Sequence, residues 1–125
     1  MPRDIIFTPK SASHPAYSQA VRAAGLIFVS GTAPTDPETG QIVEGTVQQQ
    51  VAQCLENISA ILEAAGSRLD KAISATIVVA NEEDFAAINE EWMRWFPIDP
   101  PARQGAKMPV RLPGLKVSIA MIAEA

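Results

Sequence analysis

The sequence predicts an α+β fold in which a mixed sheet carries two helices on one face. Two segments with helical hydrophobic spacing each follow a different strand-like segment, and two more strand-like segments close the chain. The predicted order is β-β-α-β-α-β-β, within a single domain that spans residues 1–125. Because both helices lie on one side, the other face of the sheet needs a cover that this chain does not encode. The pattern therefore also predicts an oligomer.

The first two strands are predicted to form a hairpin. Residues 26–30 are a compact apolar run that ends at Gly31, which is typical of a buried strand. Residues 17–23 can pair with it through Ala24 and Gly25. A turn follows over residues 35–40, where Asp, Pro and Gly occupy the positions that a turn favours.

The first helix is predicted over residues 47–65. Thr46 and Gln49 have the spacing of a capping box, and Gly66 supplies a C-terminal stop. The apolar residues between them recur at helical spacing; they are Val47, Val51, Cys54, Leu55, Ile58, Ile61, Leu62 and Ala65.

The second half is predicted to add one strand, one helix and two more strands. Residues 72–80 are a β-branched run typical of a central strand. Asn81 is placed to cap the second helix, and three acids in its first turn favour the helix dipole. The apolar stripe of that helix comprises Phe85, Ile88, Trp92 and Trp95 or Phe96. The last two strands are expected at about 105–111 and 115–123.

Composition and charge narrow the classes of partner. Hydrophobic residues make up 47% of the 125 and charged residues 19%, as in an ordered globular protein. The net charge of -4, with only ten scattered basic residues, argues against nucleic acid as a main partner. The N-terminus has no basic-then-apolar leader, and no apolar run approaches the roughly 18 residues of a membrane span. We therefore expect no membrane partner and a cytoplasmic location.

Several kinds of catalytic or metal site are not predicted. One cysteine and one histidine cannot build the usual zinc site, and we expect no cofactor or metal. Cys54 falls in the apolar stripe of the first helix, so we interpret it as a small core residue and not as a reactive thiol. His14 lacks the strand-turn-helix context of a serine nucleophile and is interpreted as a solvated loop residue.

Arg103 is the leading candidate for a binding residue. It follows Pro100 and Pro101, which stiffen the chain, and its guanidinium matches a carboxylate or phosphate two bonds at a time. The alternative is a surface arginine paired with a nearby acid.

Other polar residues also leave two interpretations open. Asn89 lies close to the buried stripe, as either a structural hydrogen-bonding residue or a site residue. Ser30 and Thr32 flank Gly31 at a strand end, where hydroxyl groups either meet a ligand or simply face solvent. Tyr17, the only tyrosine, offers a flat face and a donor.

Taken together, these residues resemble the reactive-intermediate deaminase family (RidA, also called YjgF and often labelled endoribonuclease L-PSP). The matching segments are residues 15–19, 29–34, 36–40, 57–66, 84–89, 101–103, 111–113 and 122–123. The resemblance implies a chorismate-mutase-like fold of the bacillus type and a homotrimer with a central barrel. It also implies three sites in clefts between subunits.

The resemblance further implies roles for individual residues. Arg103 would hold the carboxylate of a small 2-iminoacid or enamine, with Tyr17, Ser30, Gly31 and Asn89 in the same cleft. Water would then release ammonia and a 2-oxoacid.

Two positions depart from the family pattern. Gly105 stands where active deaminases usually carry a cysteine, although its backbone donor and acceptor remain. Ser118, or Val117 if the alignment slips by one residue, stands where the family has a water-orienting glutamate. A hydroxyl can hold water but cannot take its proton near neutral pH.

Three functional hypotheses follow. The first is an imine or enamine deaminase whose catalytic residues are Arg103, Gly105 and Ser118. The second is a non-catalytic or divergent trimer that binds small carboxylates such as 2-oxoacids. The third is an endoribonuclease, which the acidic charge makes the least favoured.

Overall fold

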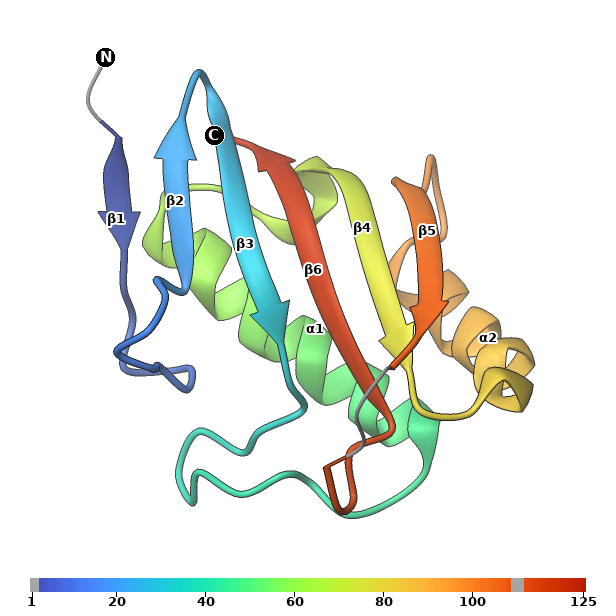
Figure 1. Cartoon of the computed structure of the whole chain (residues 1–125). Helices are drawn as coiled ribbons and strands as arrows, with labels where there is room; N and C mark the ends of the chain where they lie inside the picture. Colours follow the sequence, from blue (N-terminus) through green and yellow to red (C-terminus); the bar gives the residue numbers. More distant parts are fainter. Residues whose placement is uncertain (1–2, 109–111) are drawn as a thin grey trace.

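The computed structural model describes residues 3–108 and 112–125, which form a six-stranded sheet with both α-helices on one face (Figure 1). The strands are β1 (Asp4–Ile6), β2 (Ala20–Ala23), β3 (Leu26–Thr32), β4 (Ala72–Val79), β5 (Ala102–Lys107) and β6 (Val117–Glu124). The α-helices are α1 (Val47–Ala64) and α2 (Phe85–Trp95), and two short 3₁₀ helices are η1 (Leu69–Lys71) and η2 (Glu82–Asp84).

The strands lie in the order β1-β2-β3-β6-β4-β5. The β4 and β5 pair is parallel and every other pair is antiparallel, so the sheet is mixed. The C-terminal strand β6 lies in the middle, between β3 and β4 (Figure 1). The α+β prediction, with two helices on one face, is confirmed.

The predicted hairpin between β2 and β3 is also confirmed, with a later start. Ala24 and Gly25 both have positive φ, at 54° and 77°, as a two-residue turn of type I′ requires. The first strand of the pair starts at Ala20 and not at Tyr17. The Gln19 side chain just before it is bound to the preceding loop at Thr8, Ser11 and Ala12. Strand β1, which pairs with β2, was not predicted.

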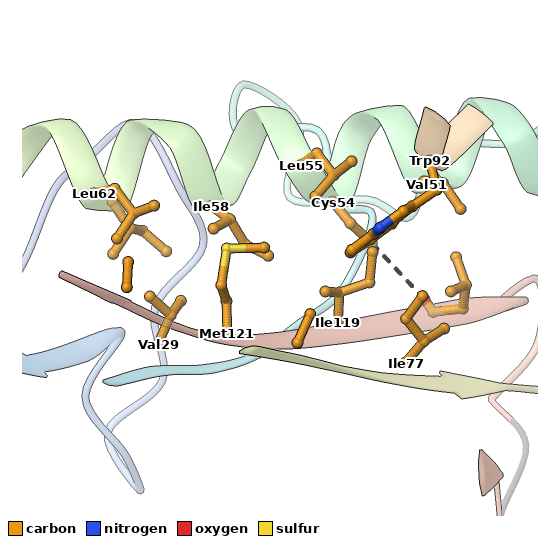
Figure 2. Packing of buried hydrophobic residues seen from close by; sticks show 14 of the residues in the cluster. Val29, Val51, Cys54, Leu55, Ile58, Leu62, Ile77, Trp92, Ile119 and Met121 are labelled. Atoms are coloured by element: carbon orange, nitrogen blue, oxygen red, sulfur yellow. Dashed lines mark hydrogen bonds between the residues drawn. The ribbon is translucent and has the colours of Figure 1, made fainter. Parts of the chain in front are cut away.

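Helix α1 follows the sequence prediction closely. The Thr46 hydroxyl accepts a hydrogen bond from the Gln49 amide at 3.2 Å, and Gln49 Oε1 accepts one from the Thr46 amide at 2.8 Å. These two bonds complete the capping box. The apolar stripe of α1 packs on the inner side chains of the sheet, as Figure 2 shows for Leu62, Ile58, Leu55, Cys54 and Val51 above Val29, Met121, Ile119 and Ile77.

The interpretation of Cys54 as a core residue is confirmed. Its side chain is fully buried, and burial raises the pKa of the thiol well above its usual range.

The second half departs from prediction at two boundaries. The Asn81 side chain accepts from the Glu83 amide, as a cap does, but the first turn is the 3₁₀ helix η2 and α2 begins only at Phe85. Strand β5 begins at Ala102, three residues earlier than predicted, because a parallel ladder with β4 starts at the Ser74–Ala102 pair. The predicted strand end at residues 109–111 lies outside the described residues, and so does Arg111 of the family-like segment.

The face of the sheet opposite the helices is uncovered in the described part of the chain. Phe28 is 42% exposed there. Between Phe28, Thr76, Gln104 and Ile122 the surface is hollowed by about 170 Å³.

Candidate functional site

The predicted site residues fall into two groups on the chain. Tyr17, Ser30, Gly31 and Ser118 line one cavity of about 300 Å³, which we call the hydroxyl cavity. Arg103 and Asn89 lie together on β5 and α2. We call Arg103, Asn89 and Trp92 the arginine cluster.

The hydroxyl cavity lies between the loop before β2, the end of β3, strand β6 and helix α1. It is lined by Ser11, Ala12, Ser13, His14, Tyr17, Gln19, Ser30, Gly31, Thr32, Ala33, Thr35, Asn57, Ile61 and Ser118. None of these lining residues is an acid, a lysine or an arginine. The described wall is therefore polar and lacks carboxylates, ammonium groups and guanidinium groups.

Gln19 organises the loop that forms one side of this cavity. Its side-chain amide donates to the carbonyls of Thr8, Ser11 and Ala12 at 2.9–3.0 Å, and its Oε1 accepts from the Thr8 amide at 2.8 Å. Gln19 is only 5% exposed, and its own carbonyl accepts from the Ser30 amide at 3.0 Å. The loop is thereby joined to strand β3.

Tyr17 and His14 stand at the mouth of the cavity as a stacked pair. Their ring centroids are 5.3 Å apart and the planes differ by 7°. His14 Nδ1 accepts a hydrogen bond from the Ala16 amide at 3.0 Å, so the neutral ring carries its proton on Nε2. Tyr17 is 56% exposed, which leaves one ring face and the phenol available.

Three hydroxyls near the end of β3 donate to backbone carbonyls. Ser30 Oγ donates to the Ser18 carbonyl at 2.6 Å, and Thr32 Oγ1 donates to the Ser30 carbonyl at 2.8 Å. Ser118 Oγ, on the neighbouring strand β6, donates to the Thr32 carbonyl at 3.5 Å. Gly31 lies between them, and a Cβ at this position would be 3.6 Å from Ser118 Oγ.

The arginine cluster holds the Arg103 guanidinium in a defined direction. One terminal nitrogen donates to Asn89 Oδ1 at 2.7 Å, and Cζ lies 5.5 Å from the ring centroid of Trp92. Among the described residues no carboxylate lies within 4.0 Å of Arg103. The structure therefore does not show the alternative of an arginine paired with an acid. Asn89 is exposed and flanks the buried stripe of α2; it does not interrupt it.

Gly105 lies two residues after Arg103 on β5 and faces Phe85 of helix α2. A Cβ at position 105 would lie 2.9 Å from Phe85 Cζ and 3.3 Å from the Ile77 carbonyl oxygen. The ring of Phe85 thus occupies the space that a larger residue at 105 would need.

The two groups are far apart within one chain. Strands β6 and β4 separate β3 from β5, which places their backbones about 14 Å apart at ordinary strand spacing. Arg103 and Ser118 also lie on opposite faces of the sheet. Arg103 lies on the helix side, against Trp92, whereas Ser118 alternates with the buried Val117 and Ile119 and faces the other side. One small ligand therefore cannot contact both groups of the same chain.

Sequence reasoning missed three residues that shape these groups. Gln19 and Trp92 were noted only as part of a motif and of an apolar stripe. Asn57 is 2% exposed, and its amide donates to the carbonyls of Ala33 and Thr35 at 3.3 and 2.8 Å. Its spacing from Cys54 and Ile61 places it on the buried face of α1, so a polar residue at that spacing was a usable signal.

In the described part of the chain, no helix has the length and apolar character that crossing a membrane requires. Similar sequences include proteins named as mitochondrial in Schizosaccharomyces pombe and chloroplastic in Arabidopsis thaliana. The cytoplasmic location therefore stays a prediction.

Comparison with known proteins identifies similar sequences and structures. The chain is 42% identical to a RutC family protein of Pyrococcus horikoshii over 89% of this chain and 88% of that one. It is 36% identical to the 2-iminobutanoate/2-iminopropanoate deaminase of Rattus norvegicus, over 97% of this chain and 89% of that one. The structure matches a conserved Rid family protein of Yersinia pestis with a TM-score of 0.93 and 31% identity. The match covers 99% of this chain and 100% of that one.

A second similar structure has a small molecule bound. Escherichia coli TdcF with bound serine matches with a TM-score of 0.87 and 33% identity, over 98% of each chain. The fold is the chorismate-mutase-like fold of the Rid proteins. Residues 8–125 match the model of the family described as endoribonuclease L-PSP, which covers nearly the whole chain. This chain therefore belongs to the endoribonuclease L-PSP family, whose Rid members include reactive-intermediate deaminases.

Proposed function

We propose that the protein hydrolyses small 2-iminoacids to 2-oxoacids and ammonia at a site formed between two copies of the chain. The observation that carries the proposal is the Arg103 guanidinium, which is oriented by Asn89 and Trp92 and has no acidic partner in the described residues. The activity named for the relative in Rattus norvegicus supports the same class of substrate.

Arg103 is suited to hold the substrate carboxylate. The guanidinium has five N–H donors, and the hydrogen bond to Asn89 uses one of them. The remaining donors include a fork that matches the two oxygens of a carboxylate. The Trp92 ring face favours the cation and limits its motion.

The hydroxyl cavity is proposed to supply the other half of the site from a neighbouring copy. Strand β5 is an edge strand, so its outer side is free to approach another molecule. The uncovered sheet face with Phe28 offers apolar surface for the same association. We propose a homotrimer in which each Arg103 faces the Tyr17 and Ser30 of a neighbour.

The reaction needs little from the protein beyond positioning. Water adds to C2 of the iminium form, and the carbon–nitrogen bond then breaks. The two hydrogens of the water leave with the nitrogen, so iminium and water yield 2-oxoacid and ammonium. Ser118 can hold the water but cannot take its proton, and the loss of a general base typically costs 10²–10⁴-fold in rate. We therefore expect slow hydrolysis of an already activated imine.

Imine hydrolysis by the native chain beside Arg103→Ala and Ser118→Glu tests this proposal. The 2-iminobutanoate is generated in the assay by an amino acid oxidase, and its lifetime is measured by trapping with semicarbazide. We expect a shorter lifetime with the native chain, no effect with Arg103→Ala and a large gain with Ser118→Glu. An unchanged lifetime at high concentrations of the native chain refutes the proposal.

The replacement of the family glutamate favours a second candidate, a trimer that binds small carboxylates without turning them over. It predicts calorimetric binding of 2-oxobutanoate that Arg103→Ala abolishes, together with no imine hydrolysis. The ribonuclease activity in the family description is the least supported, because the net charge is -4 and the described cavity wall carries no basic cluster. RNA cleavage that survives repurification and is lost in Arg103→Ala would favour it.

A further inference from the structure

We infer that His14 is a positioning residue for Tyr17 and that it acts only in its neutral form. The neutral His14 ring holds the Tyr17 ring at the mouth of the hydroxyl cavity, and protonation releases it. Ligand affinity should therefore fall as the pH decreases through the range in which histidine gains a proton. The effect on the ligand rests on the proposed function, in which Tyr17 contacts the ligand, whereas the coupling of the two rings does not.

The two rings are joined by a four-residue turn in the loop between β1 and β2 (Figure 1). The Tyr17 amide donates to the His14 carbonyl at 3.4 Å, and the two residues form an isolated antiparallel bridge. Residues that face each other in such a bridge carry their side chains on the same side, which allows the rings to stack. Pro15, at the second position of the turn, fixes one backbone angle there. The turn thus brings the two rings together.

A side-chain hydrogen bond fixes the plane of the His14 ring. Nδ1 accepts from the Ala16 amide at 3.0 Å, which a ring nitrogen does only while it carries no proton. The backbone bond across the turn, at 3.4 Å, is longer than the usual range of about 2.7–3.2 Å, so the bond to Nδ1 is the better of the two. Tyr17 is 56% exposed, so much of its surface has no contact with the rest of the described chain. The orientation of Tyr17 therefore depends on His14.

Protonation of His14 removes the hydrogen bond that fixes its ring. A protonated imidazole carries a hydrogen on both nitrogens, so Nδ1–H would face the Ala16 N–H, donor against donor. The His14 ring must then turn away from the amide. The plane against which the Tyr17 ring stacks is no longer fixed, and Tyr17 leaves its position at the mouth of the cavity.

The groups around His14 do not replace this bond. Tyr17 is the titratable group that faces the His14 ring. Within residues 3–108 and 112–125, no carboxylate lies within 4.0 Å of His14. The side chains that line the cavity beside it include no acid, lysine or arginine. The described surroundings therefore offer a protonated His14 no ion pair that would hold the ring in place.

NMR without any ligand tests the coupling of the two rings. The chain has one histidine and one tyrosine, so selective labelling gives a single set of ring signals for each. We expect nuclear Overhauser effects between the rings at pH 8 and their loss at pH 5.5, with the Tyr17 signals shifting at the same midpoint as those of His14. In His14→Phe, which keeps an aromatic ring but lacks the acceptor, the Tyr17 signals should not change over this range. Overhauser effects that persist in the native chain at pH 5.5 overturn the inference.

Calorimetry with 2-oxobutanoate tests the effect on the ligand. The ligand itself stays ionised from pH 5.5 to pH 8, because an α-carboxyl group titrates near pH 3.5 (about 3.3–3.7). We expect the native chain to bind about two- to tenfold more weakly at pH 5.5 than at pH 8, the loss typical of one ordinary hydrogen bond. His14→Phe should bind at both pH values about as weakly as the native chain at pH 5.5.

Thr39→Ala is the matched control. The Thr39 hydroxyl also accepts from the amide two residues further on, that of Gln41, but in an exposed turn outside the cavity. This variant should bind 2-oxobutanoate like the native chain at each pH. Equal native affinity at the two pH values overturns the inference, and so does the same pH dependence in His14→Phe.

Arg103→Ala distinguishes this inference from the proposed function. If Arg103 holds the carboxylate, this variant loses the ligand at both pH values and keeps the Overhauser effects between His14 and Tyr17. A native chain that binds no 2-oxobutanoate at either pH refutes the proposed carboxylate site. The Overhauser effects alone then decide whether His14 positions Tyr17.

Discussion

The contact between Gly105 and Phe85 predicts the effect of adding a single methyl group to strand β5. In Gly105→Ala, the new Cβ would lie 2.9 Å from Phe85 Cζ, 3.1 Å from Phe85 Cε1 and 3.3 Å from the Ile77 carbonyl oxygen. The ring can move, but the carbonyl belongs to the β4 backbone and has little freedom. The same argument applies to Gly105→Cys, the residue that the family usually carries at this position.

The expected destabilisation is about 1–2 kcal/mol. Overpacking a well-packed site typically costs about 1–3 kcal/mol. Replacing glycine by alanine also stabilises the fold by about 0.4–1 kcal/mol, because alanine reduces the conformational freedom of the unfolded chain. This gain applies at position 105, where φ is not in the positive region. The control is Gly31→Ala on strand β3, where the added Cβ would make an ordinary contact at 3.6 Å. It should change stability by less than about 0.5 kcal/mol.

A double-mutant cycle with Phe85→Leu provides the assay. Urea unfolding is followed by circular dichroism for the native chain, the two single variants and the double variant, at one protein concentration and after a check of oligomeric state. We expect Gly105→Ala to cost at least 1 kcal/mol less in the Phe85→Leu background, since the smaller side chain leaves the space free. An equal cost in both backgrounds, or a Gly105→Ala variant as stable as the native chain, would refute the packing argument.

Three more predictions concern other parts of the molecule. Gln19→Ala leaves three loop carbonyls without their donor and should cost about 1–3 kcal/mol in urea unfolding, whereas Gln53→Ala, which loses a single bond to Asn57, should cost less. Trp92→Leu removes the ring face from Arg103 and should weaken 2-oxobutanoate binding about two- to fivefold by calorimetry; Trp95→Leu on the same helix is the control. Burial raises the pKa of the Cys54 thiol, so the folded chain keeps this proton when the unfolded chain loses it near pH 9. The free energy of unfolding should therefore fall above that pH by about 1.4 kcal/mol per unit relative to Cys54→Ala, and parallel curves for the two proteins would contradict this.

The sequence by itself determined the elements whose causes are local. The capping box of Thr46 and Gln49 predicts where α1 begins, because both of its hydrogen bonds join residues three positions apart. The turn at Ala24 and Gly25 predicts the hairpin in the same way. The helical spacing around Cys54 predicts its burial, because it places Cys54 in the apolar stripe of α1 and that stripe packs against the sheet.

Only the tertiary structure decided the features that depend on residues far apart in the chain. Strand β5 begins at Ala102 because β4 pairs with it in parallel, a register that no local pattern encodes. Asn89 was expected close to the buried stripe; in the structure it is exposed, and its Oδ1 accepts a hydrogen bond from Arg103 at 2.7 Å. Strands β6 and β4 lie between β3 and β5 and keep Arg103 away from Ser30, and β4 lies between Arg103 and Ser118 of β6. Residues of the hydroxyl cavity and of the arginine cluster could be predicted from the sequence. Their separation within one chain follows from the strand order.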